Sequence, residues 1–592
     1  MAAWIKRSPL LRCLAIYREI PVRFAITITL FLIVNGSFSW QQWLIGRAVN
    51  EVHHGLVVAR LPEGGLDYHR AWFWLALLGG VALVRGVFQY AAGILALTIG
   101  QELLFIIRER ILMQVQRLDL AYHWRHGIGE IVTRTTRDAD KVRDALINFW
   151  RQVFETSLVI LASVGILCWY SPWLGIVPLA LTLLAISILT PQVDRLVALD
   201  RAVGAAYDAV NQDLTEGVHG VRVIKAFGLE SLRIERFERQ VETFAGEARG
   251  ALAFAAQRIP LPQVIVAMSH VWVLAYGSFL IGQGRLHVGE LVASLLVANT
   301  LVLRVEGIGS VMQIFADARS SAARIWDLLD AEPQIVSGRT PLPAGPLGLR
   351  FEHVRVAAPG GGNDILRDLS FEVRAGEIVA LVGATGSGKS TLMGLLPRLV
   401  EADDGAVLLG AESDWQDLRD LDLGRLRERV HVVPQESFLF SDTLSANLRL
   451  GAPQASEDDL REALRLAAAE EILEARKEGF DTRLGDRGIT LSGGQRQRLC
   501  LARALLSKPA VLGLDDATSA LDAATERRVL ENIRGFRHGS GQSITILVVS
   551  SRLSTILLAD RVLLLADGKI AALGTHDELA ETNTAYRDLM GL

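Results

Sequence analysis

The chain has 592 residues, half of them hydrophobic, and a mean hydropathy of +0.30, which indicates several domains and a large apolar part. A formal net charge of −4 argues against a protein that binds nucleic acid through an overall basic surface. The three cysteines, Cys13, Cys168 and Cys500, lie far apart in sequence, which argues against a disulfide framework and favours a reducing compartment.

The first half contains six apolar stretches that could each cross a bilayer, for which about 20 apolar residues are needed. They are residues 24–44, 71–99, 154–169, 173–189, 264–281 and 288–302. Arginines and lysines precede the first stretch and fill two long charged stretches, 108–149 and 194–258. The positive-inside rule therefore predicts a cytosolic N-terminus and two cytosolic loops. The alternative, six buried helices of a soluble core, does not explain these basic flanks.

Proline and glycine become frequent at residues 331–349, and the pattern then changes to short Val/Leu/Ile runs, helical stretches and glycine turns. We therefore predict an α-helical transmembrane domain of six segments at 1–330, a linker at 331–349, and an α/β domain at 350–592.

A glycine-rich loop stands between the apolar runs 378–382 and 392–396. It has the GxxxxGKS pattern in a strand–loop–helix context, which predicts that backbone N–H groups surround the phosphates of a nucleoside triphosphate. Lys389 would reach the β- and γ-phosphates, and the Ser390 hydroxyl would bind Mg²⁺. The predicted phosphate-binding residues are Gly383, Thr385, Gly386, Ser387, Gly388, Lys389, Ser390 and Thr391. The loop predicts that the α/β domain at 350–592 is a P-loop nucleotide-binding domain.

Three further motifs follow the phosphate loop. Gln435 comes after an apolar run, and the stretch Leu491, Ser492, Gly493, Gly494 and Gln495 opens a helix with a hydroxyl and two glycines, which is a second natural anion site. Asp515 and Asp516 end an apolar strand at 511–515. Asp515 is predicted to hold Mg²⁺, together with Ser390 and Gln435.

These motifs, followed by the run 517–522 that ends in Asp522, resemble those of ATP-binding cassette (ABC) transporters of the exporter type. The resemblance covers nearly the whole chain. It implies ATP and Mg²⁺ as ligands, ATP hydrolysis, and two intracellular coupling loops near 118–148 and 205–245. Because one chain carries one cassette, it also implies a dimer. In that dimer Leu491, Ser492, Gly493, Gly494, Gln495 and Asp522 complete the ATP site of the partner.

Three positions depart from the family pattern. Asp516 stands where the family usually has the Glu that orients the attacking water, and its carboxylate is shorter by about 1–1.5 Å, a misplacement that can cost about 10²-fold in rate. Ser551 stands at the usual switch histidine and is too short to reach the γ-phosphate as an imidazole would. Ala358 replaces an aromatic residue that stacks on adenine. The alternative is neutral drift, with neighbours replacing each lost group.

The resulting hypothesis is a bacterial plasma-membrane exporter made of two different chains, with the N-terminus and nucleotide-binding domain in the cytoplasm. This chain contributes the degenerate ATP site, with Asp516, Ser551 and Gln435 at its catalytic positions, and the partner carries the missing Glu and His. The substrate is an amphipathic or lipophilic small molecule, peptide or lipid. The alternatives are a homodimeric exporter or lipid flippase with slow ATP hydrolysis, and a membrane regulator that binds ATP without pumping.

Three charged residues interrupt the apolar stretches, namely Arg85, Arg304 and Glu306. Ions inside a membrane usually face a polar interior, which predicts contact with substrate in a translocation cavity. The alternatives are a structural ion pair and, for Arg304, a side chain that extends to the cytosolic interface.

Overall fold

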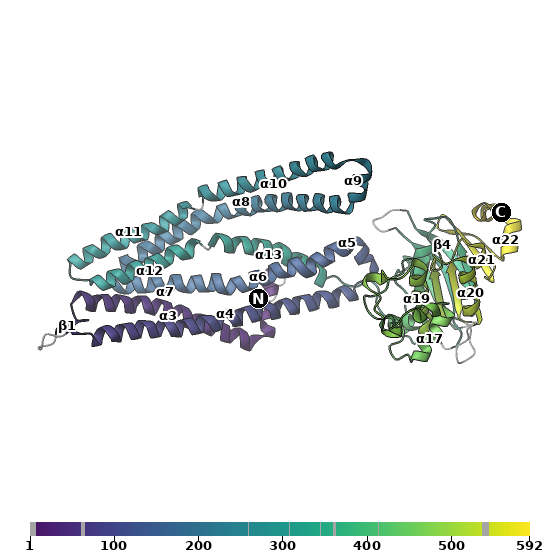
Figure 1. The fold of residues 1–592 in the computed structure, drawn as a ribbon, viewed down its shortest axis with the longest axis horizontal. Coiled ribbons are helices and arrows are strands. Elements are labelled where there is room, and N and C mark those ends of the chain that lie inside the picture. The colour runs from purple at the N-terminus through teal and green to yellow at the C-terminus, as the bar shows by residue number, and fades with distance from the viewer. Residues whose placement is uncertain are drawn as a thin grey trace. The chain divides into compact units, whose positions relative to one another are not determined.

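The computed structural model of the chain describes residues 8–60, 66–258, 260–306, 308–343, 345–358, 363–411, 414–535 and 544–592. The chain divides into two compact units, Met1–Arg117 with Gly127–Ala331, and Leu118–His126 with Glu332–Leu592 (Figure 1). The short segment Leu118–His126 therefore belongs to the second unit, although helices of the first unit stand on both sides of it in the sequence.

The first unit consists of long helices and one small β-hairpin. As far as Tyr170, its elements are α2 (Pro9–Leu14), η1 (Ala15–Glu19), α3 (Pro21–His53), β1 (Ala59–Arg60), β2 (Leu66–Asp67), α4 (His69–Arg117), α5 (Leu120–Thr133), η2 (Arg134–Asp138), α6 (Ala139–Asn148), η3 (Phe149–Phe154) and α7 (Glu155–Tyr170). The remaining helices are α8 (Pro172–His219), α9 (Val221–Phe227), α10 (Glu230–Arg258), α11 (Pro260–Gly282), α12 (Val288–Glu306) and α13 (Ile308–Leu329). The first part of α5 lies in the second unit.

Among the described residues, five helical stretches are long and apolar enough to cross a membrane. They are Pro21–His53, His69–Arg117, Leu120–Tyr170, Pro172–His219 and Glu230–Gly282, and they contain the first five predicted segments. The sixth predicted segment lies in α12, which is helical but is not one of these five, so its crossing of the membrane stays a prediction.

The predicted loop near 205–245 is a helical hairpin. It consists of the end of α8, the short helix α9 at the tip, and α10 running back along α8 (Figure 1). The turn into α10 begins at Gly228, whose φ of 63° is left-handed and favours glycine.

The second unit contains two sheets. Apolar runs with every residue buried form the centre of the larger sheet, as expected for strands covered on both faces. Its six strands have the order β12-β11-β5-β10-β9-β8, and β5, β8, β9, β10 and β11 run parallel. The smaller antiparallel sheet has the order β4-β3-β6-β7.

The strands of the second unit are β3 (Gly348–Val356), β4 (Leu366–Val373), β5 (Ile378–Val382), β6 (Asp404–Ala411), β7 (Asp414–Asp417), β8 (Val430–Val433), β9 (Val511–Asp515), β10 (Thr545–Val549), β11 (Arg561–Ala566) and β12 (Lys569–Gly574). Its helices are α14 (Lys389–Leu395), α15 (Leu423–Arg429), α16 (Leu444–Arg449), α17 (Glu457–Leu466), α18 (Glu470–Glu474), η4 (Gly479–Asp481), η5 (Asp486–Gly488), α19 (Gly493–Leu506), α20 (Ala523–Gly535), α21 (Leu553–Ile556), α22 (His576–Thr582) and α23 (Thr584–Met590). The carboxyl ends of the parallel strands are the usual place for a ligand in such a sheet.

Candidate nucleotide-binding site

The glycine-rich loop joins the end of β5 to the start of α14. Gly386 and Gly388 have φ values of 83° and 102°, which are left-handed. A Cβ on Gly388 would stand 2.6 Å from Leu366 Cδ2, so both the conformation and the space require glycine there. The Lys389 ammonium donates to the carbonyl oxygens of Gly383 and Ala384, each at 2.8 Å, and is thereby held over the loop.

The Ser387 hydroxyl lies within the same loop. Its Oγ is buried and has no hydrogen-bond partner among the described residues. Ser387 is the one predicted residue of the loop that does not line the cavity described below, so contact of its side chain with a phosphate stays a prediction. The left-handed glycines and the Lys389 ammonium, which do line that cavity, fit a phosphate group as the sequence pattern predicts.

The polar residues at the ends of β8 and β9 meet beside the loop. Ser390 and Asp515, two predicted Mg²⁺ ligands, line the same cavity. Gln435 Nε2 donates to Asp516 Oδ2 at 3.3 Å. Hard oxygen donors of this kind suit Mg²⁺, and Ser390 and Asp515 are the residues that would hold it.

The charges at the site are only partly compensated. Partial burial raises the pKa of Asp515, although the Ser390 hydroxyl and Lys389 lower it. Burial and the neighbouring Asp515 raise the pKa of Asp516. Burial also lowers the pKa of Lys389, while both carboxylates raise it. A bound triphosphate would place negative charge beside Lys389, and a divalent cation would place positive charge beside Asp515 and Asp516.

Asp516→Asn is expected to stabilise the second unit in the absence of nucleotide. The folded-state pKa of Asp516 lies above that of the unfolded chain, so its ionisation favours unfolding as the pH rises through the folded-state pKa. The melting temperature at pH 7 should therefore rise by about 1–3 °C, and the gain should vanish as the pH falls towards about 3.9, the pKa of an unfolded Asp. Differential scanning fluorimetry between pH 4 and 8 measures both effects.

A matched control for this variant is Asp417→Asn. Asp417 forms an ion pair with Arg419 at 2.6 Å, away from the two carboxylates of the site, so its removal should bring no gain at any pH. A lower melting temperature for Asp516→Asn than for the wild type at pH 7 would contradict the electrostatic description.

A cavity of about 650 Å³ collects most of the predicted residues. The predicted residues that line it are Gly383, Thr385, Gly386, Gly388, Lys389, Ser390, Thr391, Gln435, Asp515, Asp516 and Ser551. Among the described residues, its lining includes neither Ala358 nor any of the residues Leu491–Gln495 and Asp522. The two unusual catalytic positions, Asp516 and Ser551, thus face the same space as the phosphate loop.

The predicted second anion site is formed at the start of α19. Ser492 caps this helix by accepting from the N–H of Gln495 at 3.2 Å, and its own N–H donates to Gln495 Oε1 at 3.0 Å. A Cβ on Gly494 would lie 2.9 Å from the carbonyl oxygen of Ala520, so this position is tight against the loop before α20. Asp522 accepts from the N–H and hydroxyl of Thr525 and so caps α20.

The sequence analysis did not predict a network of hydrogen bonds around Glu526, which joins the segments that carry Ser551 and Asp516. Glu526 is fully buried and accepts from Thr518, Arg552, Ser554 and Thr555. Arg552 also donates to the carbonyl oxygens of Leu521 and Ser519, which ties the loop after β10 to the loop before α20. No local pattern connects residues 26 positions apart, so only the fold reveals the pair. Ile365 and Leu589, which also line the cavity, carried no sequence signal either.

Two of the three charged residues of the membrane stretches, Arg85 and Arg304, have protein partners. Arg304 forms an ion pair with Glu155 of α7 at 2.9 Å, as the ion-pair alternative requires. Arg85 donates to Gln41 Oε1 at 2.5 Å and lies 5.3 Å from the ring centroid of Phe38. The side chain of Glu306 lies outside the described residues. Contact of Arg85, Arg304 or Glu306 with a substrate stays a prediction.

Comparison of the sequence with known proteins shows the family of this chain. The sequence matches the ABC transporter transmembrane region over residues 24–305 and the ABC transporter family over residues 366–519. An uncharacterized ABC transporter ATP-binding protein of Bacillus subtilis is 30% identical over 553 residues, which make up 91% of this chain and 92% of that protein. The chain belongs to the ABC transporters. It is therefore an integral membrane protein with an ATP-binding domain.

Two further matches show what this ABC transporter is similar to. A multidrug efflux ATP-binding/permease protein of Mycobacterium tuberculosis is 34% identical over 533 residues, covering 87% of this chain and 42% of that longer protein. A bacterial Atm1-family ABC exporter with ATP bound has a TM-score of 0.82 at 24% identity, covering 96% of this chain and 98% of that one. The ABC transporter thus has an exporter fold, with the helical membrane domain ahead of the ATP-binding domain.

Proposed function

We propose that this ABC transporter is one half of a heterodimeric exporter, in which its own ATP site binds ATP and hydrolyses it slowly. The proposal rests on which residues line the cavity beside the phosphate loop. The residues that bind phosphate and Mg²⁺ are all present, namely Lys389, Ser390 and Asp515, whereas Asp516 and Ser551 replace the two residues that act on the γ-phosphate.

The geometry of Asp516 supports slow hydrolysis. Its backbone is left-handed, with a φ of 50°, and its carboxylate accepts from Gln435, so the side chain is held near the sheet. A carboxylate one methylene shorter than Glu stands about 1 Å from the position needed to orient a water molecule, a displacement that can cost about 10²-fold in rate. The buried carboxylate nearby, Glu526, cannot replace it, because four donors already occupy its oxygens.

The intact run Leu491–Gln495, here called the signature, supports an active ATP site on the partner. Ser492 and the glycines after it present a helix start and a hydroxyl, which suit the γ-phosphate of an ATP held by another chain. A partner that carries the missing Glu and His would then hydrolyse ATP at the interface that this signature completes. ATP bound at both sites would close the two ATP-binding domains and turn the membrane cavity outward, and hydrolysis on the partner side would reset them.

The proposed substrate is an amphipathic or lipophilic molecule, and the proposed location is a bacterial plasma membrane with the ATP-binding domain in the cytoplasm. The multidrug efflux name of the mycobacterial relative supports this substrate class. A homodimeric exporter or lipid flippase is the second candidate, because the Asp516 carboxylate still lines the cavity and its raised pKa suits a weak base.

Measuring ATP hydrolysis by the purified chain in lipid nanodiscs, alone and with its partner, tests the proposal. The lone chain should bind ATP with Mg²⁺ but be nearly silent, and the pair should hydrolyse ATP at a rate on the order of 1 s⁻¹ or faster. Brisk hydrolysis by the lone chain would instead support the homodimer.

A further inference from the structure

Helices α3 and α4 lie side by side in the membrane domain, and an ion pair joins them at each end of their apolar part (Figure 1). Arg23 pairs with Glu102 at 2.6 Å at the end where α3 begins. Arg70 pairs with Glu51 at 3.6 Å at the other end, where α3 stops and α4 begins. The charges at both ends of this helix pair are therefore compensated within the chain.

Arg85 is the single charged residue of α4 between these two ion pairs. Its guanidinium donates to Gln41 Oε1 of α3 at 2.5 Å and lies 5.3 Å from the ring centroid of Phe38. Gln41 stands ten residues before Glu51 and 18 residues after Arg23, which puts it about 15 Å from one ion pair and about 27 Å from the other along the helix. Neither ion pair can therefore share its carboxylate with Arg85.

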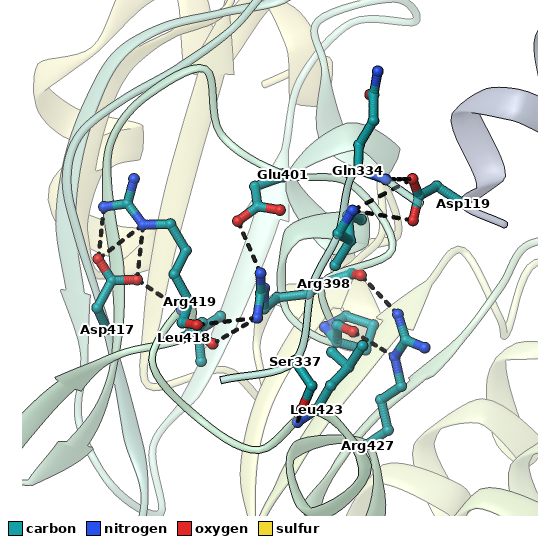
Figure 2. Close-up of polar contacts among 12 residues, drawn as sticks. Asp119, Gln334, Ser337, Arg398, Glu401, Asp417, Leu418, Arg419, Leu423 and Arg427 are labelled. Atoms are coloured by element: carbon teal, nitrogen blue, oxygen red, sulfur yellow. Dashed lines mark hydrogen bonds and ion pairs between the residues drawn. The ribbon is translucent and has the colours of Figure 1, made fainter. Parts of the chain in front are cut away.

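The charge of Arg85 is not compensated by a carboxylate. Within the residues that the structure describes, its polar contact is the neutral amide of Gln41. Other arginines of the chain do have an acid beside them, as Arg304 has Glu155 at 2.9 Å and Arg419 has Asp417 at 2.6 Å (Figure 2). An uncompensated charge is costly inside a membrane, and such residues usually mark the path of a substrate or ion.

The surface of α4 around Arg85 is open in this chain. Val84 and Val87 are exposed, and no atom lies within 4 Å of where a Cβ on Gly86 would be. The amide nitrogen of Gln41 has no partner among the described residues, so it can donate to an anion that Arg85 binds. A cation and an amide donor thus stand beside an apolar surface, which suits a molecule with an anionic group and an apolar body.

The depth of Arg85 separates a molecule in transit from a resident lipid. Lipid headgroups lie outside the hydrocarbon core, which is about 30 Å thick. The two ion pairs are 28 residues apart on α3, or about 42 Å, so the whole core fits between them. The guanidinium then lies inside the core, because it is about 15 Å or more from either ion pair. An anion that reaches Arg85 has therefore left the level of the headgroups.

We propose that Arg85 and Gln41 bind the anionic group of the transported molecule, and that the substrate is an amphiphile with a phosphate or carboxylate group. The proposal deepens the function proposed above and rests on it only in that the chain transports an amphiphile. It also distinguishes Arg85 from Arg304, whose partner Glu155 leaves no charge for a substrate to neutralise.

Binding of radiolabelled dodecyl phosphate to the full-length chain in phosphatidylcholine nanodiscs, alone and paired with its partner, tests the proposal. Empty nanodiscs measure partition into the lipid. Unlabelled dodecyl phosphate and dodecanoate should displace the label, whereas dodecyltrimethylammonium, with the same chain length, should not. Inorganic phosphate should not displace it either, because it has no apolar chain. Arg85→Gln should weaken binding about ten-fold or more, since a charge-assisted hydrogen bond is lost.

A second variant and two controls separate anion binding from a general loss of structure. Gln41→Glu places a carboxylate against the guanidinium, so it should neutralise Arg85 and weaken binding as much as Arg85→Gln while keeping the two helices joined. Arg47→Gln removes an arginine of α3 that lies over Trp43, and Arg419→Gln removes the same charge from the ATP-binding domain. Both controls should bind dodecyl phosphate as the wild type does. Size-exclusion chromatography and ATP binding show whether each variant is folded.

Three results would overturn the proposal. The first is equal displacement by the cation or by inorganic phosphate, because the site would then not select an anionic amphiphile. The second is unchanged binding in both Arg85→Gln and Gln41→Glu. The third is binding by the lone chain that disappears in the assembled transporter, because a carboxylate of the partner would then neutralise Arg85. Failure of the proposed export function would instead appear as absent transport with anion binding intact.

Discussion

Asp516→Glu combined with Ser551→His is expected to raise ATP hydrolysis by the lone chain by about 10²-fold or more. The added methylene brings the carboxylate about 1 Å farther into the cavity, and the imidazole reaches the γ-phosphate as serine does not. Both positions line the same cavity, whose volume of about 650 Å³ leaves room for the larger side chains. Two copies of the variant would hold two complete sites, because the signature Leu491–Gln495 is already intact. Steady-state phosphate release measures the change.

The control for this variant is Asp516→Gln with Ser551→His. Glutamine has the length of Glu without its charge, so this protein should bind ATP as well as the first variant and remain silent. If the Glu/His variant hydrolyses ATP no faster than the wild type, the slow step lies elsewhere and the degenerate-site interpretation is wrong.

Ser492→Arg and Lys389→Ala, both made in this chain, should separate ATP hydrolysis by the assembled pair from ATP binding by this chain's own loop. Ser492→Arg places a bulky cation at the start of α19 and should lower hydrolysis by the pair about 10²-fold or more, because donors to the reacting phosphate are worth about that much. ATP binding by this chain's own loop should be unchanged. Lys389→Ala should weaken that binding about 10²-fold, since charge-assisted hydrogen bonds are lost, but should leave much of the pair's hydrolysis.

Ser456→Arg is a matched control for the signature variant. Ser456 caps α17 with the same reciprocal pair of bonds, here to Asp459, so its loss costs a helix cap without touching a signature. Hydrolysis by the pair should stay near the wild-type rate. Equal losses from Ser492→Arg and Lys389→Ala would mean that both sites hydrolyse ATP, which contradicts the asymmetric proposal.

The sequence predicted the parts of this ABC transporter that depend on local pattern. The fully apolar run of β5, the glycine loop after it and the acidic end of β9 define the phosphate and Mg²⁺ residues, and these do lie together. The fold class was predicted for the same reason, because membrane helices and buried parallel strands have distinct compositions.

What the sequence did not predict are pairings between distant residues. The buried Glu526 that holds Arg552 and the bond from Asp119 to the linker join polar residues with no periodic signal. For Arg304 an ion pair was one alternative, but its partner Glu155 carried no sequence signal either. Residues of these types are usually exposed, so the burial of Glu526 and the partners of the others become visible only once the chain is folded. The assignment of Leu118–His126 to the ATP-binding domain is of the same kind.

The most direct test of the central claim compares two matched carboxylate variants in the assembled transporter. ATP hydrolysis is measured for the wild-type pair, for Asp516→Asn in this chain, and for the corresponding Glu→Gln in the partner. The account predicts that Asp516→Asn leaves the rate nearly unchanged, while the partner variant lowers it about 10²-fold or more. Loss of hydrolysis in Asp516→Asn would contradict the account, because it would make Asp516 the working base of this site.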